Sequence, residues 1–131
     1  MAGVFEEQGD LERALEHYRK ALAIRLNALG PEHPGVGDTY NNMGVVFGKQ
    51  GDLEQAMEHY RKALAIQEKT LGPEHPSTLN TVYGMANTLQ ASGDAASAKA
   101  LYLRCARGYE KHFGPDYEWA RKARAQAERC G

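Results

Sequence analysis

Histidine is the first residue type to consider in this chain, because its imidazole binds metals and transfers protons near neutral pH. The chain has five histidines. Four of them are two pairs of copies 42 residues apart, His17 with His59 and His33 with His75, and no two are spaced as His-x3-His. We therefore predict no metal site. We expect His33 and His75 to cap or pack the proline-flanked turns that contain them.

Cysteine and serine are the candidate nucleophiles. Cys105 occupies the repeat position held by Ala63 and Ala21, which predicts a buried packing residue without catalytic role, and two cysteines are too few for a disulfide framework. The segment 44–50 resembles a phosphate loop but is one residue short between its glycines and lacks Ser or Thr after Lys49. Three serines lie near expected helix starts with no histidine placed to serve them: Ser77, Ser92 and Ser97. The sequence predicts no catalytic site, no enzymatic activity and no cofactor.

A regular spacing of glycine organises the whole chain. Six of the 14 glycines lie 21 residues apart, at positions 9, 30, 51, 72, 93 and 114, and all five prolines follow every second one of them. Glycine adopts the left-handed conformation that ends helices, so the proline-free segments between these glycines are predicted to be helices. Short connections around Gly9, Gly51 and Gly93 alternate with longer ones, so the repeat is a helix pair of 42 residues.

Residues 8–34 and 50–76 are identical at 21 of 27 positions, which shows that the period is a true repeat. In the second copy, Leu53, Ala56 and Tyr60 recur at helical spacing with charged residues between them, which predicts one buried stripe and one solvated face. Asp52 stands where a helix N-cap belongs, with Gln55 placed to complete a capping box. Asp10 and Asp94 hold the same position in the other copies.

The spacing of residue types within the unit resembles the tetratricopeptide repeat. The motif appears as Tyr40-x2-Met43-Gly44-x2-Phe47, followed by Ala56-x3-Tyr60. Together with the two Leu-Gly-Pro-Glu-His-Pro connections, it is similar to the 42-residue repeats of kinesin light chains and related arrays. The resemblance covers essentially every residue. It implies an all-α fold, a right-handed superhelical solenoid of antiparallel helix pairs, with a role in protein–protein interaction.

We expect a single domain, 1–131, of about three repeats. Repeat 1 spans 1–30 with a truncated first helix, because Met1 aligns with Met43; repeat 2 spans 31–72, repeat 3 spans 73–114, and a capping helix spans 115–131. The first apolar stripe should be under-covered, since each repeat buries its face mainly against its neighbours. In the capping helix, Trp119, Ala120, Ala123 and Ala127 are expected to form the apolar side.

Charge and hydropathy limit the classes of partner. Sixteen basic against 17 acidic residues leave a net charge of -1, which predicts no binding to nucleic acid. The longest apolar runs are far shorter than the roughly 18 residues of a membrane span, and we expect a cytoplasmic protein without membrane contact. The first 18 residues are acidic and the last 13 basic. These charges and the under-covered stripe suggest head-to-tail self-association through the N-terminal end.

The resemblance implies that an extended peptide of a partner binds on the concave side, on the faces of the first helices that lie opposite the core stripe. Asparagine suits this role because its amide both donates and accepts hydrogen bonds. The predicted peptide-binding residues are Asp38, Asn41, Asn42, Val45, Lys49, Asn80, Tyr83, Asn87, Gln90, Lys122, Gln126 and Arg129. Two alternatives to a peptide-binding adaptor stay open: a structural, self-assembling array, and a regulatory fragment of a larger multidomain protein.

Overall fold

The computed structural model describes the backbone of residues 2–131 and the side chains of residues 9–131. These residues form helices joined by short connections, with no strand among them. The helices are α1 (Ala2–Leu29), α2 (Pro34–Lys49), α3 (Leu53–Thr70), α4 (Pro76–Ala91), α5 (Ala95–Phe113) and α6 (Glu118–Arg129). The predicted all-α fold is confirmed.

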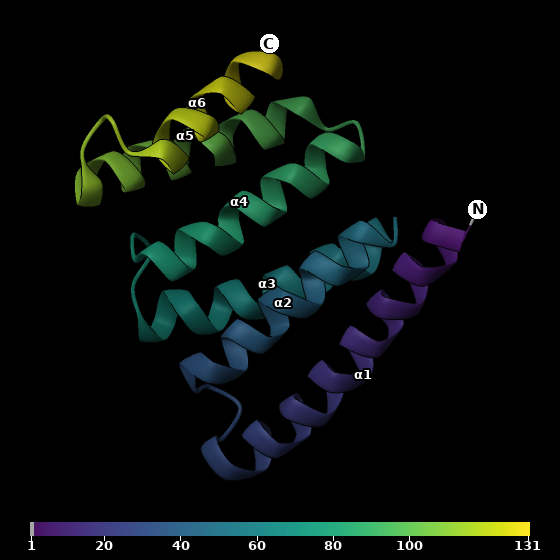
Figure 1. Cartoon of the computed structure of the whole chain (residues 1–131). Coiled ribbons are helices and arrows are strands. Elements are labelled where there is room, and N and C mark those ends of the chain that lie inside the picture. The colour runs from purple at the N-terminus through teal and green to yellow at the C-terminus, as the bar shows by residue number, and fades with distance from the viewer. Residues whose placement is uncertain (1) are drawn as a thin grey trace.

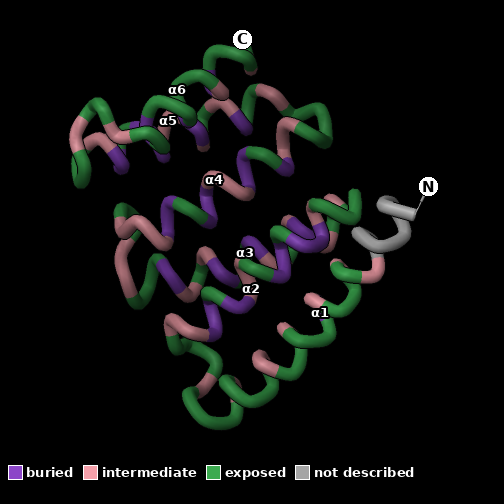
Figure 2. Tube along the Cα trace, viewed as in Figure 1, coloured by how far each residue is buried: buried purple, intermediate pink, exposed green. Residues whose placement is uncertain are grey.

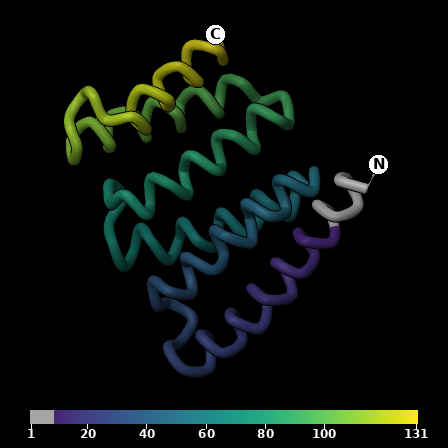
Figure 3. The backbone as a smooth tube through the Cα atoms, in the orientation of Figure 1, coloured from purple at the N-terminus to yellow at the C-terminus, as the bar shows by residue number. Residues whose placement is uncertain are grey.

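The helices stack in chain order, from α1 at one end to α6 at the other (Figure 1). Consecutive helices run in opposite directions and contact each other, as the path of the backbone shows (Figure 3). The first helices of the two complete pairs, α2 and α4, also contact each other. Helices two apart in sequence therefore share one side of the stack, which is the arrangement of a solenoid of helix pairs.

The periodic glycines end the helices as predicted. Gly30, Gly51, Gly72, Gly93 and Gly114 have φ between 81° and 95°, the left-handed region that residues with a side chain rarely adopt. Each follows the end of a helix, so the chain can turn back against the preceding element. The pattern of glycines in the sequence thus locates every connection between α1 and α6.

The expected turn at Gly9 is not formed, and this prediction was wrong. The single helix α1 runs through Gly9, where a truncated first helix was expected to end, and Asp10 lies inside α1 instead of capping a new helix. An added Cβ at Gly9 would meet no atom within 4 Å, so no neighbour forces a bend there. Glycine permits a turn but does not impose one. Continuing the helix keeps its backbone hydrogen bonds at a cost of about 1 kcal/mol for one glycine.

Side-chain caps fix the starts of four helices. Asp52 and Asp94 accept hydrogen bonds from the backbone N–H of Gln55 and Ser97, at 3.2 and 3.1 Å, as predicted for N-caps. The two connection histidines cap α2 and α4. Their Nδ1 atoms accept from the N–H groups of Gly35 (2.9 Å) and Ser77 (3.1 Å), which confirms that His33 and His75 have a capping role.

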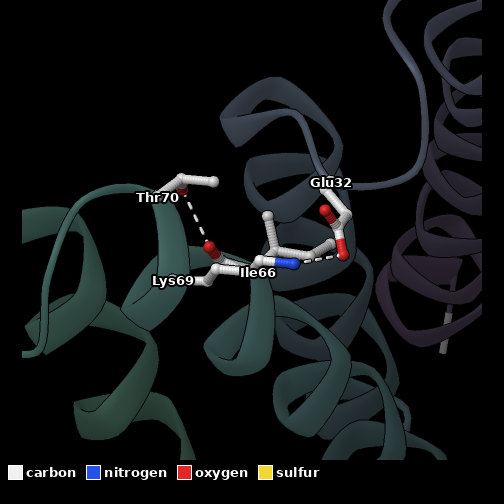
Figure 4. Close-up of polar contacts among 4 residues, drawn as sticks. All are labelled: Glu32, Ile66, Lys69 and Thr70. Atoms are coloured by element: carbon white, nitrogen blue, oxygen red, sulfur yellow. Dashed lines mark hydrogen bonds and ion pairs between the residues drawn. The ribbon is translucent and has the colours of Figure 1, made fainter.

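An exposed ion pair repeats with the helix pairs. Lys69 at the end of α3 lies 2.7 Å from Glu32 in the preceding long connection, and Lys111 lies 3.0 Å from Glu74 one repeat later. Figure 4 shows the first pair, with the Thr70 hydroxyl donating to the carbonyl of Ile66 nearby. Because both pairs are largely exposed, each contributes at most about 1 kcal/mol. They orient the long connections more than they stabilise the fold.

Burial differs between copies of the same repeat position. Ala56 and Tyr60 in α3 are 0% and 4% exposed, whereas their copies Ala14 and Tyr18 in α1 are only half-buried. Figure 2 shows the change along the stack, with buried segments concentrated in the middle helices. The predicted under-covered first stripe is therefore present, although Leu15 within it is 5% exposed.

The C-terminal helix covers the other end of the stack. Ala120, Ala123 and Ala127 are buried against α5, as expected of a capping helix. Trp119 was expected on the same buried side, and this prediction was wrong, since its side chain is 43% exposed. It lies one residue before Ala120 and is therefore rotated by about 100° from the buried stripe.

Candidate functional site

A groove of about 630 Å³ lies between α2 and α4 and extends to the start of α6. Its wall along α4 runs from Asn80 to Ala91, twelve residues, or roughly 16 Å of helix. The lining side chains and glycines come from five helices and one connection: Asn41, Val45, Gly48, Lys49, Leu53, Tyr60, Asn80, Tyr83, Gly84, Asn87, Thr88, Ala91, Tyr109, Tyr117 and Trp119. The groove follows the seam between the two parallel first helices.

Six of the twelve predicted peptide-binding residues line this groove together: Asn41, Val45, Lys49, Asn80, Tyr83 and Asn87. The other six lie outside it, with Asp38, Asn42, Lys122 and Arg129 exposed and Gln90 and Gln126 half-buried. The sequence analysis placed Asn42 in the middle of the predicted binding face of α2. The groove instead follows the α2–α4 seam, which lies to one side of that face and exposes positions 41, 45, 48 and 49.

Four aromatic residues of the groove were not predicted: Tyr60, Tyr109, Tyr117 and Trp119. Tyr60 and Tyr109 belong to the second helices, where the repeat pattern assigned them to the core, and they are indeed 4% and 1% exposed. Their rings form part of the groove floor because they pass beneath the first helices. The sequence signal that could have located one of them is the pair of helical glycines, Gly44 and Gly84, which leave room for a ring.

Tyr60 is held between those two glycines. A Cβ added to Gly44 would lie 2.8 Å from the Tyr60 ring, and one added to Gly84 would lie 2.7 Å from it. Both distances are far below van der Waals contact, so the absence of a side chain at each position is required for the ring to reach the groove. The two first helices thus approach each other with one tyrosine from α3 between them.

Hydroxyl groups of the second helices orient the asparagines of the groove. Tyr109 donates a short hydrogen bond to Oδ1 of Asn80, and Tyr102 donates to Oδ1 of Asn87 at 2.5 Å. Oε1 of Gln90 lies 3.0 Å from the same Tyr102 hydroxyl. With each Oδ1 engaged by a hydroxyl, the amide NH₂ groups of Asn80 and Asn87 remain to donate to a ligand.

The electrostatics of the groove favour hydrogen-bond donation. Of the side chains described around it, Lys49 alone carries a charge. Burial raises the pKa of Tyr60 and of Tyr102 to about 12, and burial also raises the pKa of Tyr109. These phenols therefore remain protonated through the physiological range, and those of Tyr102 and Tyr109 act as donors toward Asn87 and Asn80.

The buried cysteine and the acidic and histidine side chains were compared with the requirements of a nucleophile and of a metal site. Cys105 is fully buried, its Sγ donates to the carbonyl of Leu79, and burial raises the pKa of its thiol to about 12, so the predicted packing role is confirmed. Among the residues with described side chains, no three of His, Cys, Asp and Glu gather as metal ligands would. No described helix is long and apolar enough to cross a bilayer.

Comparison with known proteins agrees with this architecture. A sequence model of the tetratricopeptide repeat matches residues 1–69 and 39–111. A search of curated proteins gave no match. Proteins with this fold generally act as scaffolds for protein–protein interaction and not as enzymes.

Solved structures show the same solenoid. A kinesin light chain-like array of nearly identical TPR-like repeats from Podosopora anserina is 25% identical and superposes with a TM-score of 0.84, over 98% of this chain and 61% of that one. A variant of the same array is 24% identical, with a TM-score of 0.83 and the same coverage. BtubC (BKLC) from P. vanneervenii is 17% identical and superposes with a TM-score of 0.69, over 98% of this chain and 59% of that one. At this identity the likeness shows the fold alone.

The present chain thus spans about three fifths of the length of these arrays. Its helix pairs form the right-handed superhelical solenoid that the repeat pattern predicted, closed by a terminal helix. On the sequence match and on this architecture, the chain belongs to the tetratricopeptide repeat family, with 42-residue repeats of the kinesin light chain-like kind.

Proposed function

We propose that this chain is a scaffold that binds an extended peptide segment of a partner protein in the groove between α2 and α4. The observation that carries the proposal is the row of oriented amides: Asn80 and Asn87 lie on one helix face with their oxygens engaged and their NH₂ groups available. A peptide lying along α4 offers backbone carbonyls to such donors. Recognition of the main chain supplies affinity, and the surrounding side chains supply specificity.

Trp119 provides a direct test, because it is the single tryptophan of the chain and lines the groove. We expect peptides selected from a random dodecapeptide phage library to change its fluorescence in a saturable way. Asn87→Ala should weaken their binding about 5- to 10-fold, the loss of one hydrogen bond in a desolvated site. The matched control is Asn27→Ala, which removes an exposed asparagine of α1 outside the groove. Equal affinities of the two variants would refute the proposal.

Self-association is a second candidate, favoured by one observation. Ile24 on α1 is 68% exposed, whereas its copy Ile66 is half-buried beside Gly37 of α2. We propose that a second copy covers this face of α1 with its C-terminal end, where Arg121 and Arg129 are exposed. Light scattering should then show an increase in mass with concentration that Ile24→Asp abolishes. A constant monomer mass at high concentration and low salt would exclude this candidate.

A further inference from the structure

The part of the groove near the start of α6 has an aromatic wall. Tyr83 and Trp119 meet edge to face, with ring centroids 5.6 Å apart and planes at 86°, and Tyr109 meets Tyr117 in the same way at 5.5 Å. Trp119 is held further by Lys122, whose Nζ lies 4.6 Å from the ring centroid. These contacts fix the rings while leaving Trp119 43% exposed. A preformed aromatic surface binds apolar, conformationally rigid groups at little entropic cost.

The hydrogen-bonding groups of the groove are unbalanced. Oδ1 of Asn80 and Oδ1 of Asn87 each accept from a tyrosine hydroxyl. Oδ1 of Asn41 lies 3.2 Å from the Thr81 hydroxyl, but the single proton of that hydroxyl is better placed for Oε1 of Gln67, at 2.5 Å. The Thr88 hydroxyl donates to the carbonyl of Gly84 within α4. Along α4, what remains directed to a ligand is therefore mostly donors. An ordinary peptide backbone brings as many N–H donors as carbonyl acceptors, whereas each proline brings a carbonyl and no N–H.

The spacing of the two α4 asparagines selects a backbone conformation. Asn80 and Asn87 are seven residues apart, two helical turns, or about 10.5 Å along the axis. In polyproline II, carbonyls three residues apart point the same way and are separated by about 9.3 Å. In a β-strand, carbonyls on one side repeat at about 6.6 Å and about 13 Å. The polyproline II repeat matches the donor spacing better than either strand distance.

We propose that the occupant of this groove is a proline-rich segment in the polyproline II conformation. Its prolines pack on the wall formed by Tyr83, Trp119 and Tyr117, and its carbonyls at positions i and i+3 accept from Asn80 and Asn87. This inference rests on the proposed peptide-binding function and specifies its ligand. It joins three independent features of the site: a rigid aromatic wall, the oriented amide donors of α4, and an asparagine spacing along α4 close to three residues of polyproline II.

The direct test is binding of fluorescein-labelled decaproline by fluorescence anisotropy, compared with a Gly-Ser decapeptide and a Val-Thr decapeptide of equal length. We expect decaproline to bind at least tenfold more tightly than either. Gly-Ser lacks both rigidity and apolar groups, and Val-Thr favours the extended strand conformation, which has the wrong carbonyl spacing. Affinity for decaproline equal to or lower than that for either control would overturn the inference.

Variants locate the binding within the site. Trp119→Ala should weaken decaproline binding about tenfold or more, and Leu29→Ala, which removes an exposed apolar side chain at the end of α1 outside the groove, should leave it unchanged. Tyr102→Phe keeps the ring but releases Oδ1 of Asn87, so the amide can rotate, and we expect a three- to fivefold loss. Circular dichroism spectra matching the unaltered chain show that a variant is folded. Decaproline binding that is insensitive to both Trp119→Ala and Tyr102→Phe would overturn the inference.

The phage selection distinguishes this inference from the function on which it rests. Selected peptides rich in proline at positions i and i+3 support both. Peptides that bind in the groove, lose affinity with Asn87→Ala and show no enrichment of proline refute the polyproline II ligand but leave the peptide-binding function standing. A selection without any binder sensitive to Asn87→Ala refutes both.

Discussion

Replacing Gly84 by alanine tests whether the Tyr60 ring is clamped between α2 and α4. The new Cβ would lie 2.7 Å from Cε1 and Cζ of the ring and 2.9 Å from its hydroxyl oxygen. The ring cannot retreat, because Gly44 lies against it as well and the side chain is 4% exposed. Overpacking of this kind costs about 1–3 kcal/mol, partly offset by the gain of about 1 kcal/mol that alanine brings to a helix.

Gly48→Ala is the matched control for Gly84→Ala. Gly48 also lies within a first helix and lines the groove, but an added Cβ there would meet no atom within 4 Å. Alanine should therefore raise the free energy of unfolding at this position by up to about 1 kcal/mol. The higher helix propensity of alanine contributes to both variants. The difference between their free energies of unfolding therefore isolates the cost of the steric clash, about 1–3 kcal/mol. For a chain of this length the difference corresponds to roughly 4–12 °C in Tm.

Thermal unfolding followed by circular dichroism at 222 nm measures this difference. We expect Gly84→Ala to melt below the unaltered chain or close to it, and Gly48→Ala to melt above it. In a Tyr60→Leu background the cost of Gly84→Ala should fall by about 1–2 kcal/mol, because the clashing ring is gone. If Gly84→Ala melts at or above Gly48→Ala, or if its cost is the same without the Tyr60 ring, the clamp is not present.

Three further predictions concern caps and buried groups. Asp52→Ala should lower the free energy of unfolding by about 1 kcal/mol in urea titrations, whereas Asp10→Ala should change it by less than about 0.5 kcal/mol, since Asp10 caps no helix. Ellman's reagent at pH 8 should label the half-buried Cys130 but spare Cys105 until urea is added; native labelling of both thiols would contradict the packing described. Burial raises the pKa of Cys105 from 9.0 and the pKa of Tyr60 from 10.0, in both cases to about 12. The stability that these two buried, neutral side chains contribute is therefore complete below pH 9 and is lost as the pH rises toward 12. If unfolding by urea becomes no easier between about pH 9 and 12, this prediction is refuted.

The sequence was sufficient to predict the elements of local structure, because each depends on a few neighbouring residues. A left-handed glycine ends a helix within one turn, and the carboxylate of Asp52 or the imidazole of His33 caps a helix within three residues. The break at Gly9 was mispredicted because it depends on a distant condition. A glycine bends a chain only where a second helix can pack back on the first, and the repeat pattern does not show whether such packing is available.

The groove was only half predicted for a related reason. A periodic stripe tells which side of a helix is buried, but not how deep a ring extends beneath the neighbouring helix. Tyr60 and Tyr109 satisfy the pattern of core residues and also line the groove. Trp119 was grouped with Ala120 on the apolar side of the capping helix, but the rotation of about 100° per residue places it on the surface. Only the packing of α3 and α5 against the first helices, and of α6 on α5, reveals these placements.

The concave surface therefore depends on the helices behind it. The amides of Asn80 and Asn87 belong to α4, but the hydroxyls that orient them belong to Tyr109 and Tyr102 of α5. A substitution in the core that displaces α5 by a fraction of an ångström would lengthen these hydrogen bonds and let the amides rotate. Ligand preference would then change without any substitution on the surface that touches the ligand. In a stack built from similar copies of a helix pair, divergence of the buried second helices is thus a route to new specificity, and the tyrosines of α5 are where we expect it to act.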